Sequence, residues 1–254
     1  MQAALFVSDT PAAREAEAEL RARYRFAEPA DARVIVALGG DGFLLALLHR
    51  LLDGDVHLPV FGMNRGTVGF LMNDWSPDKL PERLEAARGF ALRPLTMTAI
   101  SQSGATVVSP AFNEVSLLRE TRQAARIEIA IDGKVRMPEL SCDGVLVATP
   151  AGSTAYNLSV NGPILPLESD LVALTAISPF RPRRWHGALL PNRSVVEFRM
   201  LEADRRPVSA VADQVEVRDV THVRVATDFG RALELLFDPE YALDDRIFAE
   251  QFLT

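Results

Sequence analysis

The sequence predicts an α/β domain followed by a β-rich domain. Apolar strand-like runs alternate with helical segments over residues 1–93, which is the pattern of a parallel α/β sheet. Within residues 94–227, several segments alternate apolar and polar side chains one by one, so this region is expected to be mostly antiparallel strands. The final segment, 228–254, ends in a helical pattern that can pack back on the first domain. At 254 residues, the chain is long enough to build both cores.

Strands and helices take turns through the first domain. Residues 3–8 predict a short strand, and residues 11–25 predict a helix capped by Asp9 or Thr10 with an early proline. The run VIVAL, residues 34–38, is typical of a strand buried on both faces. A buried helix, a strand and a second helix are predicted next, at 43–52, 58–64 and 77–89. This order predicts a Rossmann-like α/β domain.

The second domain carries signals of antiparallel strands. RIEIAIDGKVRM, residues 126–137, places its isoleucines on one face and turns at Asp132-Gly133, a strong hairpin signal. VVEFRM at 195–200 and VEVRDVTHVRVATD at 215–228 alternate in the same way. Residues 94–227 therefore predict a sandwich-like domain, and the cleft between the two domains is the expected ligand site.

Composition excludes several classes of function. The formal charge is −7, and acidic and basic residues are mixed along the chain, so no basic stripe favours a nucleic-acid partner. No stretch approaches the length of a membrane helix and the N-terminus lacks a secretory signal, so we expect a cytoplasmic protein without a membrane partner. The single cysteine, Cys142, excludes an internal disulfide and is expected to be buried. The histidines show no ligand spacing, so no metal site is predicted.

A glycine-rich turn joins a predicted strand to a predicted helix in VALGGDGFLLALLHRLL, residues 36–52. Such a turn presents backbone N–H groups and a positive helix end, which suits phosphate, and Gly39, Gly40 and Gly42 allow close approach. Asp41 is unexpected there, because a carboxylate repels phosphate unless it holds a proton, a metal or a hydroxyl. A tight turn with a local Asx hydrogen bond explains the tetrapeptide equally well. The spacing fits neither a dinucleotide fingerprint nor a P-loop.

Two longer segments also follow predicted strands. FGMNRGTVGFLMN, residues 61–73, should lie beside the first glycine turn, because the carboxyl ends of neighbouring parallel strands converge. In DGVLVATPAGSTAYNLSVNGPIL, residues 143–165, Ser153 and Thr154 can cap a short helix and Tyr156 offers a ring for stacking. No Gly-x-Ser-x-Gly elbow is present, which argues against a serine hydrolase.

Two polar pairs stand next to apolar strands. Asn113-Glu114 and Asp213-Gln214 offer acceptors that can bind hydroxyls or an amine. Each is explained equally well as a pair at the surface edge of a strand.

In this order the segments resemble the NAD kinase family. The match consists of GGDG at 39–42, GMNRGTVGFL at 62–71, NE at 113–114, DGVLVATPAGSTAYNLS at 143–159 and DQ at 213–214. GGDG alone is shared with diacylglycerol-type lipid kinases and phosphofructokinases, whereas GSTAY with the upstream NE pair is far more specific. The resemblance covers most of the chain.

The resemblance implies transfer of a phosphoryl group from ATP or polyphosphate to the 2′-hydroxyl of the adenosine ribose of NAD, giving NADP. It also implies a divalent metal, Mg²⁺, that arrives with ATP, and a homodimer or homotetramer. Asp41 would be the general base, and Gly39, Gly40 and Gly42 would form the phosphate loop. The implied substrate-binding residues are Asp41, Gly42, Asn113, Glu114, Asp143, Thr154, Ala155, Tyr156, Asn157, Leu158, Ser159 and Gln214.

The chain departs from the family pattern at several positions. Phe43 stands where threonine is frequent, and Asn161, expected in a left-handed conformation, replaces a glycine. Ala124 and Ser141 stand where basic or imidazole side chains are frequent, so the source of positive charge for the NAD pyrophosphate is open. The nearby arginines are Arg122, Arg126 and Arg136, each of which also fits a solvated surface.

Two other functions stay open at this point. A lipid or sphingoid-base kinase would share GGDG, but it would need a greasy groove and has no use for GSTAY. A catalytically silent NAD-binding module would keep the pocket and lose the base, whereas Asp41 is present.

Overall fold

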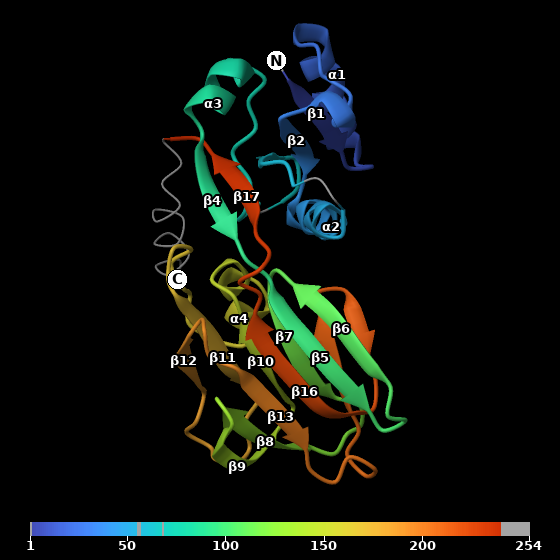
Figure 1. The fold of residues 1–254 in the computed structure, drawn as a ribbon, viewed down its shortest axis with the longest axis vertical. Coiled ribbons are helices and arrows are strands. Elements are labelled where there is room, and N and C mark those ends of the chain that lie inside the picture. Colours follow the sequence, from blue (N-terminus) through green and yellow to red (C-terminus); the bar gives the residue numbers. More distant parts are fainter. Residues whose placement is uncertain (1, 55–56, 68, 240–254) are drawn as a thin grey trace. The chain divides into compact units, whose positions relative to one another are not determined.

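The fold comprises two compact units, seen here in a computed structural model (Figure 1). The residues that the structure describes are 2–54, 57–67 and 69–239. Within them, the N-terminal unit comprises residues 2–92 with 231–239, and the β unit comprises residues 93–230. No helix in the described residues is long and apolar enough to cross a membrane.

A five-stranded sheet in the order β1-β2-β3-β17-β4 forms the centre of the N-terminal unit. β1, β2, β3 and β17 run parallel to one another. β4 is antiparallel to β17, and the arrows of these two strands point in opposite directions in Figure 1. The predicted parallel α/β architecture is thereby confirmed. The strands are β1 (Ala3–Val7), β2 (Val34–Gly39), β3 (Val60–Asn64), β4 (Arg88–Leu92) and β17 (Leu233–Phe237).

The helices of this unit pack their apolar stripes on the sheet. They are α1 (Pro11–Arg23), α2 (Asp41–Leu52) and α3 (Leu80–Ala86). A 3-10 turn, η1 (Pro29–Asp31), has no buried residue. Thr10, rather than Asp9, caps α1, because its hydroxyl accepts from the backbone N–H of Ala13 at 3.3 Å. Leu20 of α1 lies in one buried cluster with Phe61 and Met63 of β3. These contacts fix β2 and β3, whose ends carry the glycine loops.

One helix prediction in this unit is partly wrong. A helix was expected over 77–89, but α3 ends at Ala86 and residues 88–92 form β4. β4 pairs along its length with β17, which lies far away in the sequence. A local apolar pattern cannot reveal such a partner, so both strands were missed.

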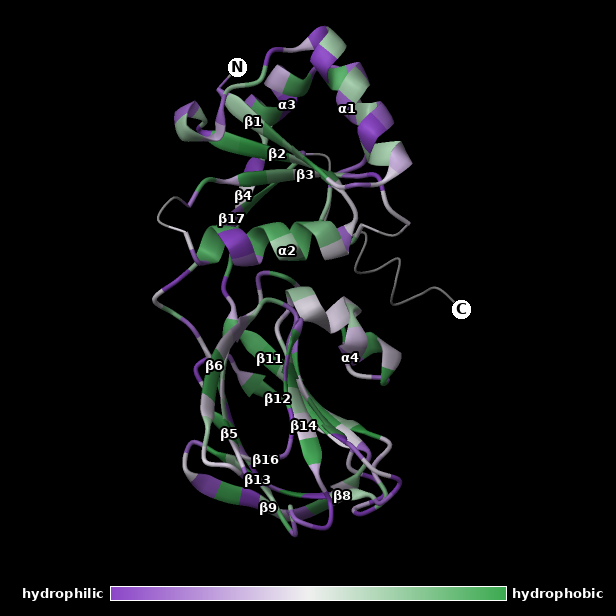
Figure 2. Ribbon diagram, turned by 90° about the vertical axis from the view of Figure 1, so that its right-hand side faces the viewer, coloured by the Kyte–Doolittle hydropathy of each residue, from purple (hydrophilic) through white to green (hydrophobic). Residues whose placement is uncertain are grey.

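Two six-stranded antiparallel sheets make up the β unit, in the orders β12-β11-β10-β7-β14-β15 and β6-β5-β16-β13-β8-β9. The predicted β-rich sandwich is confirmed (Figure 2). The first sheet comprises β7 (Glu114–Arg119), β10 (Gly144–Ala148), β11 (Leu171–Ile177), β12 (Gly187–Pro191), β14 (Val208–Ala212) and β15 (Val215–Val217). The second comprises β5 (Leu95–Ser101), β6 (Thr106–Ala111), β8 (Ala125–Ile131), β9 (Lys134–Cys142), β13 (Val196–Met200) and β16 (Val220–Thr227).

The predicted hairpin closes where its turn chemistry indicated. Asp132 and Gly133 both have positive φ, at 52° and 73°, as a two-residue type I′ turn requires. Ile127 and Ile129 point into the core between the sheets. Cys142 lies in the same core, as expected, and burial raises the pKa of its thiol to about 12.

The sheet that contains β10 is apolar on both faces. One face lines the core between the sheets, and the other carries the 3-10 turn η2 (Ala151–Thr154) and the short helix α4 (Tyr156–Ser159) (Figure 2). Leu146 and Ala148 of β10 contact a cluster that includes the half-buried Tyr156. The GSTAY segment, residues 152–156, is therefore held against a rigid sheet.

The last part of the chain returns to the N-terminal unit. Residues 233–237 form β17 between β3 and β4. The helix expected over 241–253 lies outside the described residues.

Candidate functional site

The GGDG segment forms the junction between β2 and α2. Gly39 is the last residue of β2, Gly40 caps α2 without a side chain, and Asp41 is the first helical residue. Nothing lies within 4 Å of the position that a Cβ on Gly42 would take. The start of a twelve-residue helix therefore presents open backbone beside a carboxylate.

The carboxylate of Asp41 is held by the loop that follows β3. Its Oδ2 atom accepts from the backbone N–H groups of Gly69 and Phe70, each at 3.0 Å. Its Oδ1 atom accepts from the N–H of Leu71 at 3.1 Å. These donors are 28 to 30 residues away in the sequence, so the alternative of a purely local Asx turn is wrong.

The two glycine loops lie side by side, as predicted. β2 and β3 are parallel neighbours, and Gly39 pairs with Asn64 at their carboxyl ends. A Cβ on Gly66 would come within 2.9 Å of the Cα of Gly40, which is closer than real Cβ atoms approach. Glycine at position 66 is thus required for the close approach of the loops.

In the β unit, Asp213 organises the turn that carries the Asn-Glu pair. Its carboxylate accepts from the backbone N–H groups of Phe112 at 2.7 Å, Asn113 at 3.0 Å and Glu114 at 3.4 Å. Asp213 has a φ of 49° in the turn between β14 and β15. Sequence reasoning treated Asp213 only as half of a polar pair, and its one local signal was the turn-forming preference of aspartate.

Glu114 carries a buried oxygen that has no hydrogen-bond partner among the described residues, Oε2. The backbone N–H of Tyr156 bonds to the same carboxylate. Burial, and then the charge of Asp213, raise the pKa of Glu114 to about 7. A buried acceptor without a donor is a costly feature, so this oxygen is suited to a donor supplied by a ligand.

The turn after β10 rests directly on Asn113. The Thr149 hydroxyl donates to the carbonyl of Phe112 at 2.6 Å and accepts from the N–H of Gly152 at 3.0 Å. A Cβ on Gly152 would lie 2.0 Å from the carbonyl oxygen of Asn113. The two motifs that the family resemblance joins are therefore in contact, and Thr149 was a connection that the sequence analysis missed.

Ser153 and Thr154 do not cap α4, which corrects the prediction. The N-cap of α4 is Ala155, and no side chain bonds to it. The Ser153 hydroxyl instead donates to the carbonyl of Pro150 at 2.6 Å and accepts from the N–H of Leu165 at 3.0 Å. The serine therefore closes the loop over 150–165 rather than starting the helix.

The side chain of Asn157 is fully buried and bonded inside the β unit. Its Nδ2 atom donates to the carbonyls of Ser153 at 3.2 Å and Pro163 at 2.8 Å, and its Oδ1 accepts from Thr175 at 2.6 Å. These bonds anchor α4 to β11. Asn161, with a φ of 61°, adopts the expected left-handed conformation two residues after the end of α4.

Asp143 and Tyr156 complete an acidic cluster with an aromatic ring. The guanidinium of Arg119 donates to Asp143 at 2.6 Å. Burial, then the charges of Glu114 and Asp143, raise the pKa of the Tyr156 phenol. The structure thus brings Asn113, Glu114, Asp143 and Tyr156 together within the β unit.

The other predicted residues lie around this cluster. Thr154, Ala155 and Leu158 are half-buried, Ser159 is exposed, and Gln214 is exposed in the turn after β14. Asp41 and its glycines belong to the N-terminal unit.

Metal ligands are not clustered in the described residues. No group of three or more His, Cys, Asp or Glu side chains there could hold a metal ion. The Asp41 carboxylate is already engaged by three N–H donors. The described side chains therefore do not fit a resident metal centre.

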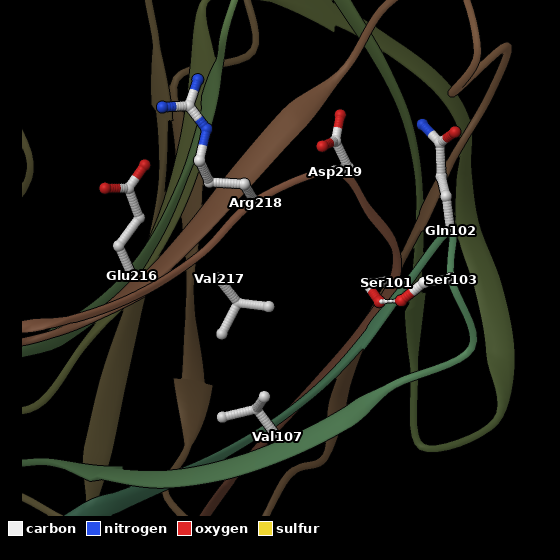
Figure 3. Close-up of a pocket in the computed structure, with 8 residues that line it drawn as sticks. All are labelled: Ser101, Gln102, Ser103, Val107, Glu216, Val217, Arg218 and Asp219. Carbon is white, nitrogen blue, oxygen red and sulfur yellow. Dashed lines mark hydrogen bonds between the residues drawn. The ribbon is translucent and has the colours of Figure 1, made fainter.

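Two pockets lie apart from the predicted residues. One, of about 520 Å³, lies between the β5–β6 turn and the strand β15 with the residues that follow it (Figure 3). Its Arg218 is neutralised by Glu120 at 2.9 Å. The other, of about 700 Å³, lies beside α3. Their lining residues include none of those predicted from the sequence.

Known proteins that are similar to this chain are phosphotransferases of one family. A family model described as the ATP-NAD kinase C-terminal domain matches residues 101–227, which places the chain among the phosphotransferases. Proteins named NAD kinase align over nearly the whole chain. The chain belongs to the NAD kinase family.

Two of these relatives illustrate the similarity. An NAD kinase of Rhizorhabdus wittichii is 63% identical over 249 residues, which cover 98% of this chain and 97% of that protein. An NAD kinase of Zymomonas mobilis is 56% identical over 248 residues, which cover 98% and 96%. The family membership sets aside the lipid-kinase alternative.

Solved structures share the fold. A yeast NADH kinase complexed with NADH has a TM-score of 0.83 at 21% identity, covering 98% of this chain and 87% of that one. An NAD kinase from Archaeoglobus fulgidus in complex with ATP has a TM-score of 0.76 at 23% identity, covering 98% of each chain.

Proposed function

We propose that this chain phosphorylates NAD, moving the γ-phosphoryl group of ATP to the 2′-hydroxyl of the adenosine ribose and giving NADP. Membership of the NAD kinase family supports this activity. In the balanced reaction, the ribose oxygen bonds to the γ-phosphorus and the bond from that phosphorus to the bridging oxygen breaks. The hydroxyl loses its proton and ADP leaves.

Asp41 is the proposed general base, and its geometry is the observation that carries the mechanism. An ionised carboxylate has about four acceptor positions, and three of those on Asp41 are used by backbone N–H groups. These bonds fix the carboxylate in one orientation while leaving capacity for one more donor. That donor is the ribose hydroxyl, whose proton Asp41 receives as the phosphorus–oxygen bond forms.

The phosphate groups of the donor bind at the start of α2 in this proposal. Gly39, Gly40 and Gly42 leave the backbone accessible there, and the free N–H groups of a helix start attract anions. The glycines thus spread the negative charge of the transferring group while Asp41 holds the acceptor.

NAD is bound by the cluster in the β unit. The unpartnered oxygen of Glu114 accepts from a hydroxyl or amide of the dinucleotide, and Asn113 and Asp143 supply further polar contacts. The ring of Tyr156 stacks on a base. The further proposed contacts are Thr154, Ala155, Leu158, Ser159, the backbone of Asn157, and Gln214.

The divalent metal, which we take to be Mg²⁺, is proposed to arrive with the phosphates of ATP. When bound, it neutralises charge on the donor phosphates. The described side chains form no cluster that would hold a metal in the absence of ATP. A cytoplasmic homodimer or homotetramer is the proposed working form, and light scattering on the purified protein tests the subunit count.

The activity is tested by incubating the chain with NAD, ATP and magnesium and detecting NADP with an NADP-specific dehydrogenase. NADP formation at a rate proportional to enzyme supports the proposal, and its absence overturns it. Parallel reactions with polyphosphate in place of ATP, and with NADH in place of NAD, define the donor and the acceptor.

A further inference from the structure

The loop between β11 and β12 is hydrogen-bonded to β9, the strand that directly precedes Asp143. Ser141 and Arg181 exchange two backbone hydrogen bonds, of 2.8 and 3.1 Å, and the N–H of Phe180 donates to Ser141 at 2.7 Å. Directly opposed residues of such a pair project to the same side. Leu140 and Cys142 point into the core, so Ser141 and Arg181 project away from it.

This loop concentrates positive charge. Arg181, Arg183 and Arg184 are all exposed. The guanidinium carbons of Arg181 and Arg183 lie 5.5 and 5.7 Å from the centre of the same ring, that of Phe180, which is 52% exposed. Two like charges are therefore held at one aromatic side chain.

No carboxylate of the described residues neutralises these two guanidinium groups. Nearby arginines are used differently: Arg119 bonds to Asp143, Arg126 bonds to Glu202 at 2.7 Å, and Arg206 bonds to Glu202 at 3.0 Å. Arg181 and Arg183 make no ion pair within 4.0 Å among the described residues. They are thus free to bind an external anion.

In the proposed NAD site, the positive charge of Arg119 is already paired with Asp143. Glu114, Asp143 and Asp213 place carboxylates around this site, and the chain as a whole has a formal charge of −7. The dinucleotide carries an anionic diphosphate, which such surroundings repel. The backbone N–H of Asp143 donates to the carbonyl of Ile177, the last residue of β11. The loop that carries Arg181 therefore begins beside the cluster.

We propose that Arg181 and Arg183 form an anion site for the diphosphate of NAD. This proposal rests on the proposed function. The two arginines supply the positive charge that the adjacent Ser141 does not. Arginine suits this role, since its planar group donates two hydrogen bonds to a phosphate at once. The loop thereby determines affinity for the dinucleotide and leaves the chemical step to Asp41.

The test compares Arg181→Gln, Arg183→Gln and the double variant with wild type. Arg193→Gln, which removes an exposed arginine without a described ion pair from the turn after β12, is the matched control. The double variant is expected to raise KM for NAD about tenfold or more, the scale of lost charge-assisted hydrogen bonds. The kcat, the KM for ATP and the melting temperature should stay close to wild type.

Other outcomes overturn the proposal. A raised KM for ATP with an unchanged KM for NAD would assign the loop to the donor phosphates, and unchanged constants would leave it without a role in binding. Calorimetry with inorganic pyrophosphate provides a readout that does not depend on catalysis. Binding by wild type that is lost in the double variant supports the anion site, even if the chain were to form no NADP. Equal binding by both would refute it.

Discussion

Asp213 accepts a hydrogen bond from the backbone N–H of Asn113 at 3.0 Å, joining two turns that are 100 residues apart in the sequence. The same carboxylate accepts from the backbone N–H groups of Phe112 and Glu114, so one side chain supplies the acceptors for three consecutive N–H groups of the turn. The negative charge of Asp213 also raises the pKa of Glu114. Structural support and ligand chemistry are therefore coupled at this point.

Asp213→Ala should destabilise the β unit and weaken NAD binding. Three backbone N–H groups lose their acceptor, and each buried donor left unpaired costs about 1–3 kcal/mol. Thermal unfolding and KM for NAD measure the two effects. Glu216→Ala, an exposed neighbour on β15, is the control. Equal melting temperatures for both variants would show that the three bonds contribute little.

Asp41→Asn should lower kcat by about 10²-fold or more, the usual scale for a lost general base. The melting temperature should also fall, because the amide turns a donor toward N–H groups that need acceptors. Both quantities are needed, since the carboxylate also fastens a loop. A lower melting temperature with kcat within tenfold of wild type would leave Asp41 with the fastening role alone.

Glu114→Gln should change how stability depends on pH. The carboxyl group has a pKa of about 7 in the folded chain against an ordinary value of 4.5. The folded state therefore binds this proton more tightly, and the stability it contributes is lost as the pH rises toward 7. The variant should gain in melting temperature relative to wild type between about pH 5 and pH 8. If the melting temperatures of variant and wild type changed equally with pH across this range, the raised pKa of Glu114 would be contradicted.

Tyr156→Ala should weaken NAD binding by about 1 kcal/mol or more if the ring stacks on a base. Tyr156→Phe keeps the ring and should retain most of the affinity. Titration calorimetry with NAD gives the affinities, and thermal unfolding gives the stability. Because Tyr156 also packs on the cluster around Leu146, a loss of stability without any loss of affinity would mark it as a packing residue only.

Gly66→Ala should disturb both glycine loops, because the new Cβ would lie 2.9 Å from the Cα of Gly40. Both kcat and the melting temperature are expected to fall, because backbone N–H groups of the adjacent loop hold the Asp41 carboxylate. Gly42→Ala is the matched substitution, with nothing within 4 Å of its Cβ, and it should melt close to wild type. Indistinguishable melting curves and turnover for the Gly66 variant would refute the close approach.

Local sequence patterns predicted the elements whose causes are local. The strand, glycine turn and helix around Asp41, and the Asp132-Gly133 hairpin, follow from apolar runs and from turn chemistry. The pairing of β4 with β17 could not be predicted in this way, because each strand depends on a partner distant in the sequence.

The same distinction applies to the candidate site. The motifs identified Asn113, Glu114 and Tyr156, but not the bonds that organise them, since Asp213 and Thr149 act on backbone groups of a distant turn. Ser153 was misassigned because its partner, Leu165, lies beyond the helix that a local pattern considers. The expectation that both domains share one ligand site stays a prediction.

The position of β17 has a consequence for biosynthesis. This strand lies between β3 and β4, yet it emerges from the ribosome only after the entire β unit has been made. Until then the sheet of the N-terminal unit has a gap between β3 and β4, and β4 lacks the strand with which it pairs. A message truncated ahead of codon 233 would therefore yield an N-terminal unit that lacks the strand between β3 and β4, even with its GGDG loop complete.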